Sequence, residues 1–316
     1  MNRLDVLLSL LALGLGFCLS RISLCAVAAT KSLMLHRRGT AVAGLAVAAS
    51  ASGLVLITLS LSWPSHPMLP ADMPVSGRIV AGGVLLGLGA LINGGCYLGS
   101  ISYLGTGNIN FLFTLLGIGL SARWTGLTMR SPIERMAGKP DSWVMAIGLF
   151  GFLAVLLLAW RSRRDAASGI RFPLLGAWPW QHAAACCGVI AALLFAYSPY
   201  WTYGIAIEAL ARVDSRPLDW RQQVPAVATF LGVGAGALLG GRFALVRPAL
   251  PRALRCLLGG AVMGYGASRI PGGNDALLLW SIPGLTLCGF VAYMAMLLTL
   301  IGAFWAGGVA RSDHAG

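Results

Sequence analysis

Long apolar segments separated by short polar stretches run through almost the whole chain of 316 residues. Crossing the hydrocarbon core of a bilayer takes about 20 residues of helix, and several segments approach or exceed that length. They lack the period of two that a transmembrane β-strand requires. The sequence therefore predicts an all-α membrane protein, a polytopic helical bundle with segments at about 4–30, 39–62, 78–94, 108–122, 143–160, 182–210, 224–241, 256–272 and 284–305. We expect the first to break near Arg21 and the sixth near Pro199.

The charge distribution agrees with this class of protein. Only 10% of the residues are charged, whereas soluble domains carry about 25%. The net charge of +13 comes from arginines between apolar segments, such as "RSRR" at 161–164, and basic loops of this kind stay in the cytoplasm. No basic patch interleaves with aromatic residues, so we do not expect nucleic acid as a partner. The lipid bilayer is the expected surrounding.

The seven cysteines and four histidines show no CxxC pair and no spacing typical of a metal site. We therefore expect no metal and no cofactor. The first residues could pass for a signal peptide, but they lack a small-x-small cleavage site and carry an acid at Asp5. We interpret them as a retained first helix.

One glycine pattern occurs twice. "GGVLLGLGALINGGC" at 82–96 resembles "GGAVMGYGASRIPGGN" at 259–274, with one extra residue in the second copy. We expect 1–316 to form a single integral membrane domain with repeat 1 at about 1–130, an additional helix and linker at about 140–181, and repeat 2 at about 182–305.

The charges of corresponding loops predict that the two repeats have inverted topology. "PSHPMLPADMPVSG" before the first glycine motif has no lysine or arginine, whereas "GRFALVRPALPRALR" before the second has four arginines. "KSLMLHRR" at 31–38 is basic, and its counterpart "VDSRPLDWRQ" is balanced. Because basic loops stay in the cytoplasm, corresponding loops face opposite sides. The side of the loop at 123–141 stays ambiguous. Inverted repeats of this kind meet around a site near the midplane, lined by broken or re-entrant helices.

The glycine pairs that end both motifs predict where the helices break. Gly83 and Gly87, like Gly260 and Gly264, have the Gly-x-x-x-Gly spacing that favours close helix packing. The closing pairs differ, because a break frees backbone groups that cost several kcal/mol each in hydrocarbon. Such a break persists where it is buried in protein or lines a cavity. We therefore expect the two breaks to face each other across a central pore, with these residues at the constriction: Gly94, Gly95, Cys96, Gly272, Gly273 and Asn274.

Four ionisable residues lie within or at the edge of apolar segments: Arg21, Glu208, Arg269 and Asp275. Such groups face a cavity or a partner, or they are helix-end residues that extend to the interface. Both interpretations stay open for Arg21 and Glu208. Arg269 and Asp275 bracket the second break, and for them a functional role is favoured. Cys18, Cys186, Cys187 and Cys256 are interpreted as packing residues.

The sequence resembles the YeeE/YedE sulfur-transport family. The resemblance rests on the glycine-spaced helix, the break at Gly94–Gly95–Cys96 and the turn Gly105–Thr106–Gly107–Asn108. Upstream, Arg21 and Cys25 match a first-helix pattern in which an arginine precedes a cysteine. The resemblance implies a multi-pass protein of the bacterial inner membrane that moves a small inorganic sulfur anion, passed along by S–H···S hydrogen bonds of pore cysteines.

Carried over residue by residue, the resemblance assigns Cys96 and Cys25 to the pore, but Asn274 stands where the thiosulfate transporters have a third cysteine. An amide suits an oxyanion better than a sulfane sulfur. Asp275 adds negative charge unless Arg269 pairs with it. These departures leave open whether the anion is thiosulfate or a related sulfur or selenium species.

Two functions from different classes stay open. The first is a transporter or channel for such an anion. The second is a non-transporting membrane partner that hands sulfur or selenium to a soluble sulfur-carrier protein through its basic loops. An enzyme is not expected, because the sequence shows no metal site, no base beside Cys96 and no cofactor motif.

Overall fold

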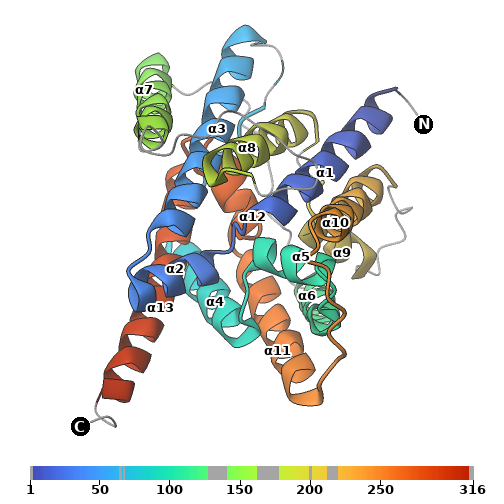
Figure 1. Ribbon diagram of the computed structural model, residues 1–316. Helices are drawn as coiled ribbons and strands as arrows, with labels where there is room; N and C mark the ends of the chain where they lie inside the picture. The colour runs from blue at the N-terminus through green and yellow to red at the C-terminus, as the bar shows by residue number, and fades with distance from the viewer. Residues whose placement is uncertain are drawn as a thin grey trace.

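The computed structural model describes residues 3–63, 66, 68–126, 141–161, 178–198, 201–211 and 220–312. This part of the chain is a bundle of helices (Figure 1), and an isolated β-bridge pairs Asn108 with Val246. The elements are α1 (Arg3–Arg21), α2 (Ala26–His36), α3 (Thr40–Ser62), α4 (Gly77–Asn93), α5 (Tyr97–Gly105), the 3₁₀ turn η1 (Ile109–Phe111), α6 (Leu112–Gly126), α7 (Ser142–Arg161), α8 (Trp180–Tyr197), α9 (Tyr203–Ala211), α10 (Trp220–Leu239), α11 (Leu250–Ala267), α12 (Asn274–Ala276), the π-helical turn η2 (Leu277–Ser281) and α13 (Leu287–Ser312).

Every apolar segment predicted from the sequence contains at least one of these helices. The expected break near Arg21 is the gap between α1 and α2. The sixth segment also divides, between α8 and α9, although Pro199 itself lies outside the described residues, as do 127–140 of the ambiguous loop and 162–177 of the linker. Two short helical pieces were not expected: α5 follows the first glycine break directly, and α12 with η2 follows the second.

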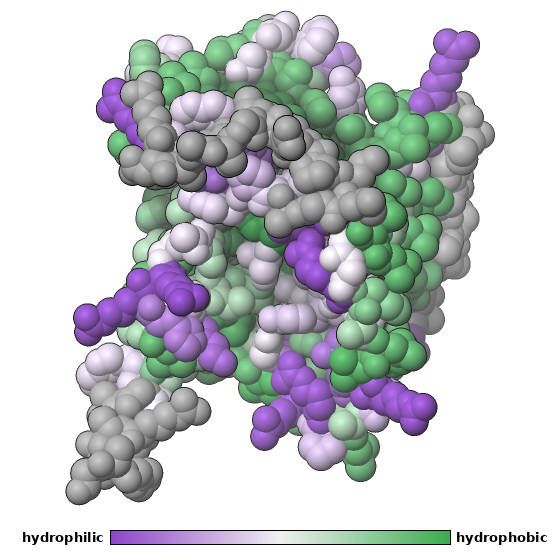
Figure 2. Space-filling view, viewed as in Figure 1, coloured by the Kyte–Doolittle hydropathy of each residue, from purple (hydrophilic) through white to green (hydrophobic). Residues whose placement is uncertain are grey.

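In the described part of the chain, six helical segments are long and apolar enough to span a membrane: Arg3–His36, Thr40–Ser62, Gly77–Gly105, Ser142–Arg161, Trp180–Tyr197 and Leu287–Gly307. Large apolar side chains are exposed on the outside of the bundle, including Trp124 (74% exposed), Phe150 (71%) and Trp305 (66%). Figure 2 shows hydrophobic residues over much of one face, with hydrophilic residues gathered toward its lower end. An apolar outer surface is what a multi-pass membrane protein presents to lipid.

The two glycine-rich helices, α4 and α11, run antiparallel against each other. A Cβ atom added to Gly82 would lie 3.0 Å from the carbonyl oxygen of Gly266, and one added to Gly266 would lie 2.8 Å from that of Gly82. Gly89 and Gly259 show the same reciprocal approach, each at 2.7 Å from the other's carbonyl oxygen. The alignment of the motifs places Gly82 on Gly259 and Gly89 on Gly266. Gly82 therefore contacts the counterpart of Gly89, and Gly89 contacts the counterpart of Gly82.

The Gly-x-x-x-Gly pairs face the opposite side of each helix and receive a neighbour there. Gly83 packs on Ala292 and Gly87 on Met296 of α13, with added Cβ positions 2.3 and 2.9 Å from their carbonyl oxygens. In α11, Gly260 lies as closely, at 2.3 Å, against the carbonyl oxygen of Thr114 in α6, and Gly264 packs on the same helix. The interpretation of these glycines as packing residues is confirmed.

The remaining helices pair in the same crossed way. In the chain order of the two halves, α1 packs on α10 while α8 packs on α3, and α2 contacts α13 while α9 contacts α6. In each case an early helix of one half lies on a later helix of the other. The additional helix α7 packs on α3 and stands at the edge of the bundle (Figure 1).

The loops before α4 and α11 are also exchanged between the halves. The chain before α11 pairs with the turn after α5, where Val246 N–H donates to Gly107 and Ile109 N–H donates to Val246, at 2.9 and 3.2 Å. The chain before α4 reaches the region after η2, where the Asp72 carboxylate accepts from the backbone N–H groups of Leu287 and Cys288, each at 3.1 Å. A carboxylate is favourable at this helix N-terminus, the start of α13.

Candidate functional site

The first break is closed by a buried polar network around Asn93, the last residue of α4. The chain turns at Gly94, whose φ of +70° suits glycine. Asn93 Nδ2 donates to the Gly95 carbonyl at 2.6 Å and to Ser100 Oγ at 2.9 Å, while Thr114 donates to Asn93 Oδ1 at 2.7 Å. Backbone freed by the break is therefore partly bonded by a side chain, as a low-dielectric interior requires.

A cation stands over the same break. The two terminal nitrogens of Arg252 lie 2.9 and 3.0 Å from the position a Cβ of Gly94 would take. The guanidinium carbon is 5.2 Å from the centre of the Phe111 ring. Positive charge is stabilised here because the carbonyl ends of α4 point toward it. The antiparallel packing of α11 on α4 brings Arg252 to this place.

The second break also turns at a glycine with positive φ, but an asparagine follows its glycine pair where the first break has a cysteine. Gly272 has φ +95°, and Gly273 is extended and precedes α12. Asn274, predicted to lie at the constriction, is the first residue of α12, because Leu277 N–H donates to the Gly273 carbonyl at 3.0 Å and closes a helical turn there.

The thiols of Cys96 and Cys25 come together at the starts of two helices. Cys25 immediately precedes α2 and Cys96 immediately precedes α5, and both are 1% exposed. The Cys96 sulfur accepts a hydrogen bond from Ala26 N–H at 3.3 Å. The two thiols lie close together, because a Cβ added to Gly99 would lie 2.5 Å from Cys25 Sγ and 3.7 Å from Cys96 Sγ. Both sulfurs therefore lie where helix dipoles place partial positive charge.

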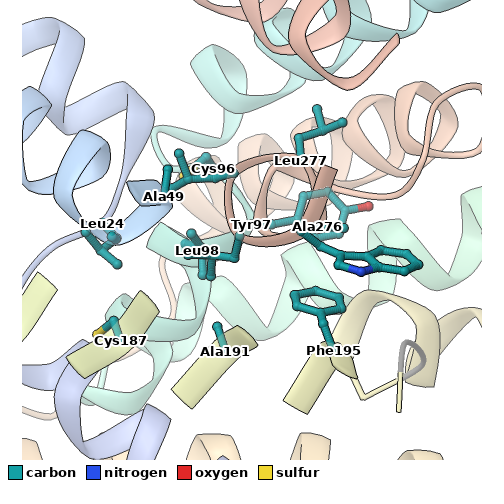
Figure 3. Close-up of a cluster of buried hydrophobic side chains, with 14 of the residues drawn as sticks. Leu24, Ala49, Cys96, Tyr97, Leu98, Cys187, Ala191, Phe195, Ala276 and Leu277 are labelled. Atoms are coloured by element: carbon teal, nitrogen blue, oxygen red, sulfur yellow. The ribbon is translucent and has the colours of Figure 1, made fainter. Parts of the chain in front are cut away.

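Asn274 joins the second break to the first. Its Oδ1 accepts a hydrogen bond from the backbone N–H of Tyr97 at 2.9 Å, directly beside Cys96. The Tyr97 ring lies against Gly273, whose added Cβ would be 2.8 Å from it. Figure 3 shows Cys96 and Tyr97 in the same buried cluster as Ala276 and Leu277. Segments about 180 residues apart in the chain thus share one site.

Several buried polar atoms at this junction have no hydrogen-bond partner among the described residues: Nδ2 of Asn274, Oδ1 of Asp275 and the hydroxyl of Tyr97. All three residues are at most 2% exposed. Buried polar groups are normally bonded, so each such atom calls for an explanation. Unused donors and an unused acceptor beside a pair of thiols are features of a binding site.

A pair of Arg269 with Asp275, which the sequence left open, is not among the contacts the structure describes. The guanidinium of Arg269 instead lies over the ring of Tyr265, at 4.5 Å, and donates to the hydroxyl of that tyrosine. Tyr265, in the last turn of α11, is therefore the described partner of Arg269, which lies in the turn directly after that helix.

Two other predicted residues lie in different surroundings. Arg21 contacts Gly240 at the end of α10 and stacks on Phe17, at 4.6 Å. Asn108 forms the bridge to Val246 and accepts from Asn110 N–H at 3.2 Å, so it holds the turn after α5. Within the described hydrogen bonds, neither residue is joined to Cys96.

Tyrosines around the junction were missed by sequence reasoning. Tyr203 donates from its hydroxyl to the Tyr97 carbonyl at 3.1 Å, and the two rings lie 5.5 Å apart. Tyr293 of α13 is also buried, 6% exposed. The sequence position of Tyr97 could have indicated its role, because Tyr97 directly follows Gly-Gly-Cys just as Asp275 directly follows Gly-Gly-Asn.

The fold and the site define a polytopic helical membrane protein in which two glycine-broken helices converge on a pair of buried thiols. The chain belongs to the sulphur transport family, whose sequence model matches residues 21–302. It is similar to the thiosulfate transporter TsuA of Spirochaeta thermophila, with 26% identity over 320 residues, covering 90% of this chain and 93% of that relative. The family resemblance stated from the sequence is confirmed.

Proposed function

We propose that this chain carries a small inorganic sulfur-containing anion, thiosulfate or a related species, across the bacterial inner membrane. The anion passes a central constriction lined by Cys96 and Asn274. The observation that carries the proposal is the convergence of two thiols and two helix N-termini at the glycine break of a membrane-spanning bundle. Membership of the sulphur transport family and the likeness to a thiosulfate transporter support the same substrate class.

The donors at the site suit an anion with one soft end and one oxygen-rich end. A thiol is polarisable and donates weakly through S–H, which fits a terminal sulfur. The Nδ2 group of Asn274 is a buried donor with no described partner, which fits a sulfonate oxygen. An anion that bridges Cys96 and Asn274 would use both ends, and neither group requires a metal or a cofactor.

The site is closed in this conformation, because Cys96 and Asn274 are at most 1% exposed. An anion therefore reaches the thiols only when neighbouring elements move. The short pieces α5 and α12 with η2 are suitable for such motion, since they are joined to the long helices by glycines and not by continuous helical hydrogen bonds.

We infer that the two halves form inverted repeats. The reciprocal glycine contacts of α4 with α11, and the crossed pairing of α1, α3, α8 and α10, support an internal two-fold relation that makes counterparts antiparallel. Cysteines introduced at Val75, before α4, and Leu245, before α11, test the inference, because both sites are exposed. In intact cells a charged thiol reagent is expected to label the first and not the second. Labelling of both from one side would contradict inversion.

Flux measured in liposomes tests the proposed function. Purified chain without any soluble protein is expected to move radiolabelled thiosulfate into the vesicles, and unlabelled thiosulfate, sulfite and selenium analogues would rank the substrates by competition. The alternative function, transfer of sulfur to a soluble carrier, predicts no flux together with stable binding of the carrier to the basic loops. Absence of flux for every sulfur anion would overturn transport.

A further inference from the structure

Asp275 is a buried carboxyl group in the middle of the proposed passage. It directly follows Asn274, which is hydrogen-bonded to the residue after Cys96. The residue is 2% exposed, and its Oδ1 atom has no hydrogen-bond partner among the described residues. The carboxyl and the Tyr97 ring both approach Gly273: a Cβ added there would lie 2.6 Å from Asp275 Oδ1 and 2.8 Å from that ring.

The surroundings supply Asp275 with no described counter-charge. Asp275 lies within electrostatic range of Tyr97 of α5 and Tyr203 of α9, and the acid Glu208 lies within such range of Tyr97. Across the glycine break, Arg269 is directed to Tyr265. η2, which packs on α12, has no titratable side chain. These neighbours are neutral or acidic, and an ionised carboxyl with an unpartnered oxygen is strongly disfavoured in such a place.

An ionised Asp275 would also repel the proposed substrate. A dianion that bridges Cys96 and Asn274 would contact the residue directly before Asp275 in the chain. A protonated Asp275 removes the repulsion and gives the carboxyl a donor to direct at an oxygen of the anion. Buried carboxyl groups without a counter-ion inside membrane bundles commonly carry protons in transport.

We propose that Asp275 binds the proton that enters together with the anion, so that transport is proton-coupled. The inference rests on the proposed function and assigns the proton as the ion to which anion transport is coupled. Asp275 takes up a proton while the site is open to the outer side. It stays protonated while the site changes the side to which it opens, and it then releases the same proton inside. A proton that moves with each dianion lowers the net negative charge that must cross against an inside-negative membrane potential.

The test uses purified full-length chain in liposomes that hold a trapped pH dye, with the membrane potential clamped by potassium and valinomycin. Adding thiosulfate outside is expected to acidify the interior of wild-type vesicles, with a proton taken up for each anion. The Asp275→Asn variant keeps the shape of the side chain but cannot ionise. Whatever its rate, its anion flux is expected to proceed without acidification. Asp275→Glu, which keeps an ionisable group, is expected to retain proton uptake.

Glu208→Gln is the matched control, since Glu208 is the other buried acid near Tyr97. This variant is expected to keep the wild-type ratio of protons to anions. Wild-type anion flux without acidification would overturn the inference and leave the proposed transport intact, whereas a lack of any anion flux would overturn both. Loss of coupling in Glu208→Gln with coupling kept in Asp275→Asn would also overturn it. If Asp275→Asn does not transport, an imposed pH gradient is applied to the wild type, and its failure to drive accumulation of thiosulfate would likewise overturn proton coupling.

Discussion

Cys96→Ala is expected to lower thiosulfate flux into liposomes by about 10- to 100-fold. The change removes the thiol that lies at the junction of the two glycine breaks, beside Cys25 and Asn274. A hydrogen bond to a charged partner contributes about 1.5–3 kcal/mol, and each 1.4 kcal/mol corresponds to a factor of ten. Initial rates of radiolabelled thiosulfate uptake, at equal amounts of reconstituted protein, measure the effect.

Two further variants separate the chemical role of Cys96 from its structural role. Cys96→Ser keeps an acceptor for Ala26 N–H but replaces the polarisable sulfur, so it is expected to fold like the wild type and to remain slow. Cys256→Ala removes another fully buried cysteine, on α11, and is expected to transport at nearly the wild-type rate. Equal losses in Cys96→Ala and Cys256→Ala would indicate that the defect comes from packing.

Gly266→Val is expected to prevent stable folding of the bundle. The added Cβ would lie 2.8 Å from both the Gly82 carbonyl oxygen and the Leu86 backbone nitrogen, and backbone atoms cannot rotate away as a side chain can. Separating α4 from α11 would also pull the two breaks apart. Overpacking of this kind costs about 3 kcal/mol or more when the neighbour cannot move. The yield of monodisperse protein in detergent and its unfolding temperature report the loss.

Gly302→Val provides the matched control for this prediction. Gly302 lies on α13 with no atom within 4 Å of its added Cβ, so it has open space beside it. The variant is expected to purify and unfold like the wild type. If both valine variants behave alike, the close approach of α4 and α11 does not stabilise the fold.

The sequence was sufficient for the long helices and for the places where they break. Runs of apolar residues have few structural options in lipid, because each backbone group must be bonded inside the chain. The same logic located the turns at Gly94 and Gly272, which adopt positive φ angles, and explained the packing of Gly83 and Gly260. These features depend on local composition, which a single sequence contains.

The finer parts of the site depend on contacts between distant segments, and for that reason the sequence did not reveal them. Asn93 looks like an ordinary helix-end residue until Thr114 and Ser100 approach it. Tyr97 gains its role from Asn274, far along the chain. The short helix α5 is rich in glycine and serine, and the cysteine before it makes no side-chain cap. Neither helix propensity nor a capping residue therefore predicts this helix.

Protection of the Cys96 thiol by substrate is the measurement that tests the proposed passage most directly. In a variant that keeps only Cys25 and Cys96, the two cysteines of the proposed passage, a small charged thiol reagent is expected to modify Cys96 slowly, because the site opens only transiently. Peptide mass identifies which of the two cysteines is modified. Thiosulfate is expected to slow this modification at concentrations that saturate uptake, and sulfate much less. A Cys96 that never reacts while uptake continues, or that reacts at the same rate with and without thiosulfate, would contradict a passage lined by this thiol.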